Sequence, residues 1–585
     1  MKPKSFIVLF SALAVFGIIM SACAPAATAA PAAPAAPAAV ATTAPAAPAA
    51  TATSVPPTPT PRPPYDPASF TGDVVGDCKN GQILKEIAAV DSLTVKFSLC
   101  QPEPAFREKV AFSAFSIQPK AYLEKAIVDH SILEKPVGTG PYMLDSWKRG
   151  ESVTFKRFDG YWGDKAKTST LVFRWSKEGA ARLLELQSGT VDGIDNPSPD
   201  DFTKIAADSS LKLYPREANN VLYFGMTNTF APFDKKEVRQ AIAMGIDRDR
   251  IVKNFYPAGS TVADYFTPCS IVNACVGNKW YSFDAAAAKA LLAKAGYPDG
   301  FKTHIYIRDV VRSYMPDPQV IATELQAQLK ANLNIDADIV VLESGKMVTD
   351  SQNGALSGIH LLGWNGDYPH ISDWLNYFFT ESNNEWGKPY PDIYKPLDTG
   401  ASMADPKKAE SYYLAANNAI KDEVPMIPVV HGGSATVFKA DVVGAHASPL
   451  GDEYFAVMKP GNRDTFVWMQ NAEPLSLYCN DETDGESIRA CNQVLESLLS
   501  FEVGGTAVKP GLATSCDPNA DLTVWTCHLR PNVKFHDGST LTANDVVMSW
   551  QVAWDYNHPL HIGNTGAFEY FTTLWGNLLN APPAS

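Results

Sequence analysis

The stretch VKFHDGSTLTANDVVMSW, residues 533–550, carries the signals for a turn that leads directly into a helix. Residues 536–540, HDGST, contain aspartate, glycine and serine, which favour tight turns because of their backbone freedom and short polar side chains. Thr542 and Asp545 then have the spacing of a capping box, in which each side chain binds the backbone N–H of the other residue. The stretch therefore predicts a turn over 536–540 and a helix that begins after Thr542.

Outside this stretch, strand patterns alternate with helix patterns. Residues 92–99, 152–158 and 169–175 alternate apolar and polar side chains, as half-buried strands do. Such a mixture predicts an α/β fold.

Two further stretches predict helices. Residues 284–296 run from Asp284, a favoured N-cap, through an alanine-rich helix to Gly296 at its C-terminal end. Residues 235–255 predict one core-facing helix, because their apolar or small residues recur near helical spacing. These residues are Val238, Ile242, Gly245, Ile246 and Ile251.

The first 65 residues differ in composition from the rest of the chain. Residues 1–23 have a basic start, an apolar run and small residues before Cys23, which predicts a bacterial lipoprotein signal peptide whose lipid anchor is that cysteine. An ordinary signal peptide with an incidental cysteine is the alternative. Residues 24–65 are an alanine- and proline-rich tract that cannot bury a core, so they predict a disordered tether. The folded body is expected to begin at residue 66.

Cysteine usage in the body favours disulfide bonds. The eight remaining cysteines are even in number and fall as neighbours along the chain, which in an extracellular protein suggests up to four local bridges. Pairing between nearest neighbours is one choice among many connectivities. A zinc site is disfavoured because no Cys-x2-Cys spacing or tight Cys/His group occurs. The candidates are Cys78, Cys100, Cys269, Cys275, Cys479, Cys491, Cys516 and Cys527.

Charge and motif content exclude several function classes. The net charge is -14, and no basic run is present, which argues against a nucleic-acid partner. Common nucleophile-elbow, zinc-protease and phosphate-loop motifs are also missing from the sequence. His558 and His561 have a spacing that could serve a metal, but no carboxylate or cysteine pattern accompanies them. We expect no catalytic residue, no metal and no cofactor.

Six stretches together carry a family resemblance. PVGTGPYMLDSWKRGESVTFKRFDGYWG and LLGWNGDYPHISDWLNYFF are the most characteristic of them. They resemble the extracellular solute-binding proteins of the dipeptide/oligopeptide ABC-transporter family, bacterial family 5. The stretches are residues 136–163, 184–194, 231–252, 288–301, 361–379 and 422–429.

The order of these signatures is unusual. In that family, a segment resembling residues 533–550 belongs in the N-terminal third, and an EPxSL-like strand such as the one in residues 472–486 precedes it. Here both lie near the C-terminus, and no signature occurs twice. Residues 463–585 therefore resemble the family's N-terminal block and residues 66–462 the remainder, as in a circular permutant. A truncated tandem pair or a gene-assembly fault remains the alternative.

The resemblance implies a two-lobed α/β fold of the periplasmic-binding-protein type (type II, the large peptide-binding class). Lobe I would combine residues 66–228 and 431–585, and lobe II would span residues 229–430. Hinge crossings are expected near Asn228 and Val430. A monomer of this kind captures an extracellular peptide between its lobes and delivers it to membrane permease subunits. It would be held by its lipid at the cell envelope, on the outer face of the cytoplasmic membrane or in the periplasm.

The resemblance also implies ligand-binding positions. Asp367 stands where relatives have the aspartate that pairs with the peptide's ammonium group, and Trp364 would form an aromatic wall. The backbone of neighbouring residues would bind an extended peptide, while Trp364 as a core residue and Asp367 as a helix cap are the structural alternatives. The remaining positions carried over are Gly363, Asn365, Gly366, Thr483, Asp484, Gly485, Phe568 and Tyr570.

Other ligands and roles stay open at this point. The same fold could bind an oligosaccharide, or a metal chelate through His370. A secreted hydrolase is disfavoured because the sequence offers no nucleophile with a base. A receptor or chaperone-like protein of the same fold is a further alternative. The partner of the ligand's carboxylate is left unassigned.

Overall fold

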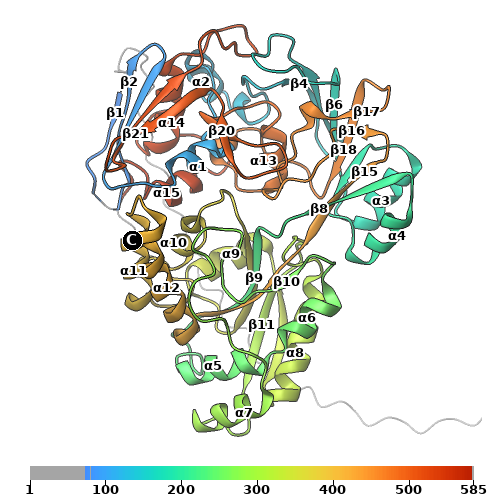
Figure 1. Ribbon diagram of the computed structural model, residues 1–585, viewed down its shortest axis with the longest axis vertical. Helices are drawn as coiled ribbons and strands as arrows, with labels where there is room; N and C mark the ends of the chain where they lie inside the picture. The colour runs from blue at the N-terminus through green and yellow to red at the C-terminus, as the bar shows by residue number, and fades with distance from the viewer. Residues whose placement is uncertain (1–72, 80, 583–585) are drawn as a thin grey trace, which may run out of the picture. The chain divides into compact units, whose positions relative to one another are not determined.

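The computed structural model describes residues 73–79 and 81–582, all within one unit, Pro61–Ser585. Helices and strands alternate along it, as predicted for an α/β fold (Figure 1). The predicted signal peptide, Cys23 and the tether over residues 24–65 lie outside the described residues.

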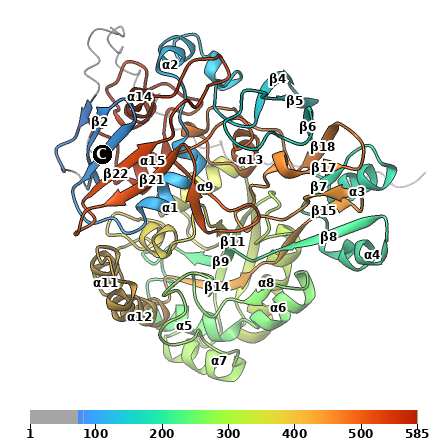
Figure 2. The same cartoon turned by 45° about the horizontal axis from the view of Figure 1, so that its top comes forward.

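A five-stranded antiparallel sheet joins the two ends of the described chain. Its strands follow the order β1-β2-β3-β22-β21, so a strand from the last part of the chain pairs with β3 (Figures 1 and 2). Buried and half-buried residues alternate along β3, which confirms the strand predicted over residues 92–99. The strands are β1 Asp73–Val75, β2 Leu84–Asp91, β3 Thr94–Leu99, β21 Ala513–Pro518 and β22 Val524–Leu529.

A seven-stranded sheet follows the order β4-β5-β6-β18-β7-β15-β8. Its central strand β18 lies parallel to β6 on one side and to β7 on the other, although it comes much later in the chain. β5 and β6 confirm the predicted strands at 152–158 and 169–175. The strands are β4 Tyr142–Lys148, β5 Ser152–Arg157, β6 Thr170–Trp175, β7 Gly193–Asp195, β8 Leu211–Arg216, β15 Ser434–Lys439 and β18 Thr465–Gln470.

A six-stranded mixed sheet is built from the middle of the chain in the order β10-β14-β9-β13-β11-β12. Its strands are β9 Asn220–Met226, β10 Thr261–Val262, β11 Lys302–Arg308, β12 Asp336–Leu342, β13 Ile359–Asn365 and β14 Met426–His431. Two short antiparallel pairs complete the described strands. They are β16 Val442–Val443 with β17 Lys459–Pro460, and β19 Leu499–Phe501 with β20 Val508–Pro510.

The described residues form fifteen α-helices. Seven of them come from the segments before and after the six-stranded sheet, which also supply the five- and seven-stranded sheets. They are α1 Phe106–Ala111, α2 Lys120–Ala126, α3 Gly179–Ser188, α4 Phe202–Ala207, α13 Gly485–Cys491, α14 Ala543–Trp554 and α15 Glu569–Leu574. Those within the span of the six-stranded sheet are α5 Lys236–Gly245, α6 Arg248–Phe255, α7 Ala285–Lys294, α8 Pro318–Leu333, α9 Ser344–Gln352, α10 Leu375–Phe378, α11 Pro391–Ala401 and α12 Pro406–Glu423.

The buried apolar side chains divide the described chain into two regions. Region I has the five- and seven-stranded sheets, and its core draws on residues before 212 and after 436, together with Tyr368 from the segment after β13. Region II has the six-stranded sheet, and its core spans Val221 to Val430. The chain crosses between them after β8, at 217–219, and after β14, at 432–433. The first crossing precedes the position near Asn228 expected from the sequence, because all of β9 is buried in region II.

Helix α14 confirms the prediction from residues 533–550. The backbone N–H of Thr542 donates to Asp545 Oδ2 over 2.8 Å, and a capping box starts the helix. Its Trp550 is fully buried and stacks on Phe115, with ring centroids 5.2 Å apart. The segment that looks displaced in the sequence is thus part of the core of region I.

The prediction of a single helix over residues 235–255 is wrong. These residues form two helices, α5 and α6, with a break at Ile246 and Asp247. The cause is local, because the Asp247 side chain accepts a hydrogen bond from the N–H of Arg250 and caps the second helix. The residues predicted to face the core are buried nevertheless. At α7, by contrast, the predicted cap is confirmed, since Asp284 accepts from the N–H of Ala287.

All four nearest-neighbour disulfides are confirmed. One of them joins directly opposed residues of β21 and β22, where the two Cα atoms lie 4.0 Å apart. Another encloses the start of α13. The pairs are Cys78–Cys100, Cys269–Cys275, Cys479–Cys491 and Cys516–Cys527.

Candidate functional site

The end of β13 holds the segment GWNGD, residues 363–367. Gly363, Trp364 and Asn365 pair with β9 in an antiparallel register. A side chain at Gly363 would collide with the backbone of Val221 and the ring of Tyr314. Glycine is required here because another chain segment approaches closely. The pairing and this contact fix the backbone just before Asp367.

Asp367 lies where regions I and II meet. Its Oδ1 accepts a hydrogen bond from the Tyr570 hydroxyl over 2.9 Å, and Tyr570 belongs to α15 of region I. Its Oδ2 is buried and has no hydrogen-bond partner among the described residues. Burial raises the pKa of the Asp367 carboxyl to about 7, and the nearby Glu569 carboxylate acts in the same direction. A buried carboxylate with a free oxygen is suited to a cationic partner.

The Asp367 side chain does not cap the helical turn that follows it, so the helix-cap alternative is wrong. The following short 3-10 turn, Ile371–Asp373, is capped by the His370 side chain, which accepts from the N–H of Ser372. Asp373 in turn accepts from the backbone N–H of Asp367 over 2.8 Å. Asp373 thus holds the backbone of Asp367 and leaves the Asp367 carboxylate to face region I.

Trp364 is half-buried beside the same contact. It stacks on Tyr377 with ring centroids 4.5 Å apart and meets Phe378 edge-on. The Tyr377 hydroxyl donates to Glu569 of α15 over 3.3 Å. Trp364, Asp367 and Tyr570, which the sequence predicts as site residues, are therefore brought together by the structure.

The predicted segment 483–485 lies at the start of α13 in region I. Asp484 caps this helix by accepting from the N–H of Ser487, while its other carboxylate oxygen is buried without a hydrogen-bond partner among the described residues. Burial, with Glu486 nearby, raises the pKa of Asp484 to about 6. Thr483 and Gly485 are exposed, and a side chain added at Gly485 would meet no atom within 4 Å. Thr483 and Gly485 are thus open to solvent, whereas the Asp484 carboxylate is turned into the protein.

Arg312 is a charged residue of region II that the sequence did not single out. Its guanidinium lies 3.9 Å from Glu486 of α13, a long contact for an ion pair. The next residue, Ser313, donates to Asn365 Oδ1 over 2.8 Å, so Arg312 lies beside the GWNGD segment. The chain holds 49 lysines and arginines, and nothing local in the sequence distinguishes this one.

Gly366 and Phe568 have packing roles. A side chain at Gly366 would collide with Asn219 and Trp374, so this glycine permits close packing at the first crossing. Phe568 is fully buried and packs on His561 with ring centroids 4.3 Å apart. In this arrangement Phe568 has no surface to offer a ligand, and its neighbour Tyr570 is 5% exposed, with its hydroxyl bound to Asp367.

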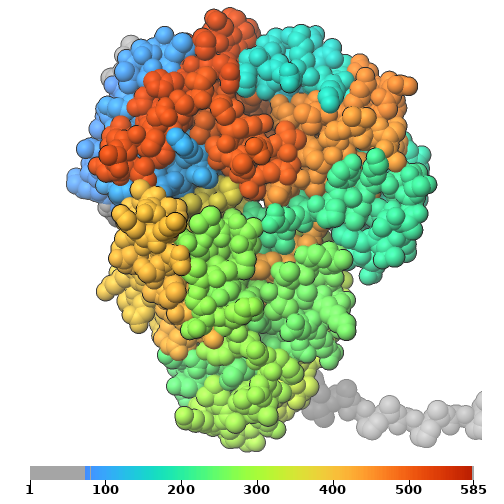
Figure 3. Space-filling view, in the orientation of Figure 1, coloured from blue at the N-terminus to red at the C-terminus, as the bar shows by residue number. Residues whose placement is uncertain are grey.

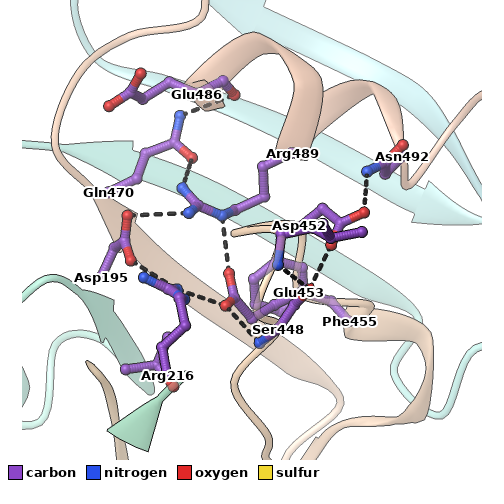
Figure 4. A network of polar contacts seen from close by, with 12 residues as sticks. Asp195, Arg216, Ser448, Asp452, Glu453, Phe455, Gln470, Glu486, Arg489 and Asn492 are labelled. Carbon is purple, nitrogen blue, oxygen red and sulfur yellow. Dashed lines mark hydrogen bonds and ion pairs between the residues drawn. The ribbon is translucent and has the colours of Figure 1, made fainter. Parts of the chain in front are cut away.

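A buried network of charges supports α13 (Figure 4). Arg489 of this helix contacts Asp195 and Glu453 over 3.0 and 2.9 Å. Arg216, the last residue of β8, contacts the same two carboxylates over 3.0 and 2.5 Å. Although burial acts in the opposite direction, the two guanidinium groups hold the pKa of Glu453 down at about 2. The network ties α13 to the strand from which the chain leaves region I.

The candidate metal ligands do not gather into a metal site. Among residues 73–79 and 81–582, no three His, Cys, Asp or Glu side chains are placed to share one ion. His370 Nδ1 is engaged with the Ser372 hydroxyl over 2.8 Å, and burial lowers the pKa of His370 to about 4. Within the same residues, no helix combines the length and apolar character needed to cross a membrane.

Comparison with known proteins identifies the family. The model of the bacterial extracellular solute-binding proteins, family 5, matches residues 40–386 and 507–568. The dipeptide-binding protein of Escherichia coli is 28% identical over 382 residues, which cover 64% of this chain and 71% of the relative. Heme-binding protein A of Haemophilus influenzae is 26% identical over 388 residues, covering 65% and 71%.

A solved structure shares the fold. The dipeptide-binding protein of Pseudoalteromonas sp. SM9913, in complex with Met-Leu, superposes with a TM-score of 0.60 at 24% identity. The match covers 65% of this chain and 76% of that protein. With more than half of its residues matched by the family model, this chain belongs to the bacterial extracellular solute-binding proteins of family 5.

Proposed function

We propose that this protein binds peptides outside the cytoplasm and delivers them to the permease of an ABC importer. Family membership supports the role of solute-binding protein. Relatives named for dipeptides and for di- and tripeptides support a peptide as the solute. Cys23 would carry the lipid anchor, and residues 24–65 would tether the binding body to the envelope.

One observation carries the choice of ligand. Asp367 has a buried carboxylate oxygen without a partner among the described residues, and Arg312, whose contact with Glu486 is long, lies beside the same segment of β13. A peptide is a zwitterion, so its ammonium group would bind Asp367 and its carboxylate would bind Arg312. Each such charge-assisted contact contributes about 1.5–3 kcal/mol.

The backbone would hold the rest of the peptide. Gly363 and Asn365 on one side, and Thr483 to Gly485 on the other, would supply N–H and C=O groups to an extended chain, whereas both backbone groups of Gly366 are bound to Asn219. Peptides bound in this way gain affinity from main-chain hydrogen bonds that do not depend on sequence. Trp364 would cover the peptide with aromatic surface, and the Tyr570 hydroxyl would hold the Asp367 carboxylate in place.

Regions I and II would act as the two lobes of the binding protein. Two short crossings at 217–219 and 432–433 link them, and links of this kind suit a hinge. The Tyr570–Asp367 and Tyr377–Glu569 hydrogen bonds join the regions in this structure. Peptide binding would favour the closed arrangement, in which these groups meet.

We also propose that the chain is a circular permutant of its relatives. Strands β18 and β22 of the late block lie inside the sheets formed by the early block. The two parts also form one surface where blue and red meet (Figure 3). Near the described ends, the Ile83 N–H donates to the Trp575 carbonyl over 2.9 Å. A chain in the family's order could therefore run from the late block into the early one over a short distance.

The test is native mass spectrometry of the purified full-length chain in detergent, with identification of any ligand released on denaturation. A co-purified peptide that is lost in Asp367→Asn would support the proposal. Asparagine mimics the neutral form of the acid, so this variant should fold. Asp350→Asn, at a half-buried aspartate of α9 whose partner is Lys346, is the matched control and should retain the peptide. A released oligosaccharide or metal chelate would replace peptide as the cargo.

A further inference from the structure

A cavity of about 280 Å³ lies between regions I and II, beside the proposed peptide site. A water molecule needs about 10–15 Å³ of such volume, so the cavity could hold a side chain together with water. Its wall includes Pro369, two residues beyond Asp367, and Asn219 from the first crossing. It also includes Glu108 of α1 and Glu217.

The cavity shares two walls with the Asp367 site. The Asn219 side-chain N–H donates to the Gly366 carbonyl over 3.2 Å, immediately before Asp367. Glu108 lies one helical turn before Phe112, whose ring packs edge-on against Tyr570 at 4.8 Å. Tyr570 is the residue that binds Asp367. A peptide held at Asp367 would therefore have a side chain within reach of the cavity.

Two buried acceptor atoms of the cavity wall, on Asn219 and Glu108, have no donor among the described residues. Asn219 is 5% exposed, and its Oδ1 has no hydrogen-bond partner among the described residues. Glu108 Oε2 is likewise buried and unpartnered within that part of the chain. A buried acceptor left unpaired costs about 1–3 kcal/mol, so a ligand that donates there is favoured.

The charged side chains of the cavity wall are both acids, and burial raises the pKa of one of them, Glu108. Glu108 and Glu217 are the two charged residues among the described ones that line it. Two bases adjoin Glu108 on α1. Lys109 is engaged with Glu103 over 2.5 Å and with the Leu574 carbonyl over 2.9 Å, and Arg107 donates to the Cys516 carbonyl over 3.0 Å. Lysine and arginine side chains carry donors and a positive charge, and they bring no acceptor. The chemistry of the cavity matches such a group.

The apolar part of the wall suits the stem of a long side chain. Ile271, Val272, Pro369 and Val508 contribute apolar surface, and Val272 is 66% exposed. Lysine and arginine place their methylene groups on such surface while the charged end reaches polar partners. A cavity with apolar walls and acceptors is therefore complementary to the whole side chain.

We propose that this cavity is a specificity pocket for a cationic side chain of the bound peptide, with its ammonium or guanidinium group between Glu108, Glu217 and Asn219. The inference rests on the proposed peptide-binding function and gives the site a preference within that class. Peptides that contain lysine or arginine would bind more tightly than neutral peptides of the same length.

The experiment compares lysine with norleucine, which keeps the methylene stem and lacks the ammonium group. Ligand-free full-length protein in detergent is titrated calorimetrically with Lys-Ala, Ala-Lys and their norleucine counterparts. We expect one lysine peptide to bind at least ~10-fold more tightly than its norleucine counterpart, the size of one charge-assisted contact. Glu108→Gln should reduce this ratio to about 2 or less and leave norleucine affinity unchanged.

A second pocket variant and a control complete the experiment. Glu217→Gln, at an exposed residue, tests the second acid of the pocket without risk to the fold. The control is Glu178→Gln, at an exposed acid at the start of α3, which should leave the ratio of lysine to norleucine affinity unchanged. Equal binding of lysine and norleucine peptides by the unmodified protein would overturn the pocket but not peptide binding. If both Glu108→Gln and Glu217→Gln kept the full preference for lysine over norleucine, the proposed pocket would also be overturned. If no dipeptide binds at all, the proposed function and the pocket both fall.

Discussion

At the residue scale, the raised pKa of Asp367 makes peptide binding depend on pH. The ammonium group of a peptide binds the ionised carboxylate, so below pH 7 binding must displace a proton from a group whose pKa is about 7. We expect affinity to rise by up to about tenfold per pH unit between pH 5.5 and 7 and then to level off. Above pH ~8 the free peptide loses its own charge, and affinity should fall again.

Calorimetry in two buffers with different ionisation enthalpies would measure the displaced proton directly. At pH 6 the unmodified protein should release close to one proton per peptide, and Asp367→Asn should release none. An affinity in the unmodified protein that is constant from pH 5.5 to 7 would contradict the assignment of the ammonium group to Asp367.

The raised pKa of Asp367 also affects the stability of the ligand-free protein, which should fall with rising pH where peptide affinity rises. A carboxyl whose pKa is higher in the folded chain ionises more readily in the unfolded chain, where its pKa is about 4. Its contribution to stability therefore falls as the pH rises from about 4 towards 7. Bound peptide would remove this penalty by pairing the charge, so the ligand should stabilise the protein more at pH 7 than at pH 5.

At the scale of elements, the Arg216–Arg489 network should decide whether α13 keeps its place. Arg489→Met would leave Asp195 and Glu453 facing one guanidinium instead of two. Removing one partner from a buried ion pair costs about 3–5 kcal/mol, because the remaining charge stays buried. We expect a loss of this size in the free energy of unfolding, measured by chemical denaturation.

The matched control is an exposed pair of the same types. Arg157 contacts Asp159 over 3.0 Å at the end of β5, where the aspartate side chain is 72% exposed. Arg157→Met should change the free energy of unfolding by less than about 1 kcal/mol. Equal effects of the two substitutions would mean that the buried network contributes no more than a surface contact.

Elements also show where local sequence signals succeed and fail. The caps at Asp284 and Thr542 follow from residues within one helical turn, and both are present. The helix predicted over residues 235–255 breaks at Asp247, a residue type that favours N-caps over helix interiors. That cap was readable from the sequence, but the apolar periodicity, which continues through the break, concealed it.

At the scale of the whole molecule, the proposed permutation predicts that block order can be changed without loss of structure. A chain in which residues 463–585 precede residues 66–462, with residues 1–65 kept in front, should fold and bind peptide with unchanged affinity. The reason is that the five- and seven-stranded sheets each combine strands of both blocks. Thermal unfolding and calorimetric titration would compare the two chains.

Deleting residues 463–585 is the opposite test. It removes β18 from the middle of the seven-stranded sheet and β22 from the five-stranded sheet, and it exposes unpaired backbone groups in both. Region I should then fail to fold. If the deleted chain folded and bound peptide normally, or if the reordered chain did not fold, the permutation would be rejected.

The sequence by itself determined the features whose causes lie close together along the chain. Strand alternation and helix caps specify the α/β elements through contacts over short separations. The order of the cysteines suggested nearest-neighbour pairs as one choice, and the structure forms these four disulfides. Its motifs also indicated the family, which the comparisons show.

Only the tertiary structure decided which groups meet across regions I and II. Asp367 and Tyr570 are 203 residues apart, and Arg312 contacts Glu486 from the other region. Each contact depends on how regions I and II pack against each other, and so does the buried free oxygen of Asp367. Local patterns report the propensity of a segment, whereas the electrostatics of the site arise from desolvation and partners that docking supplies.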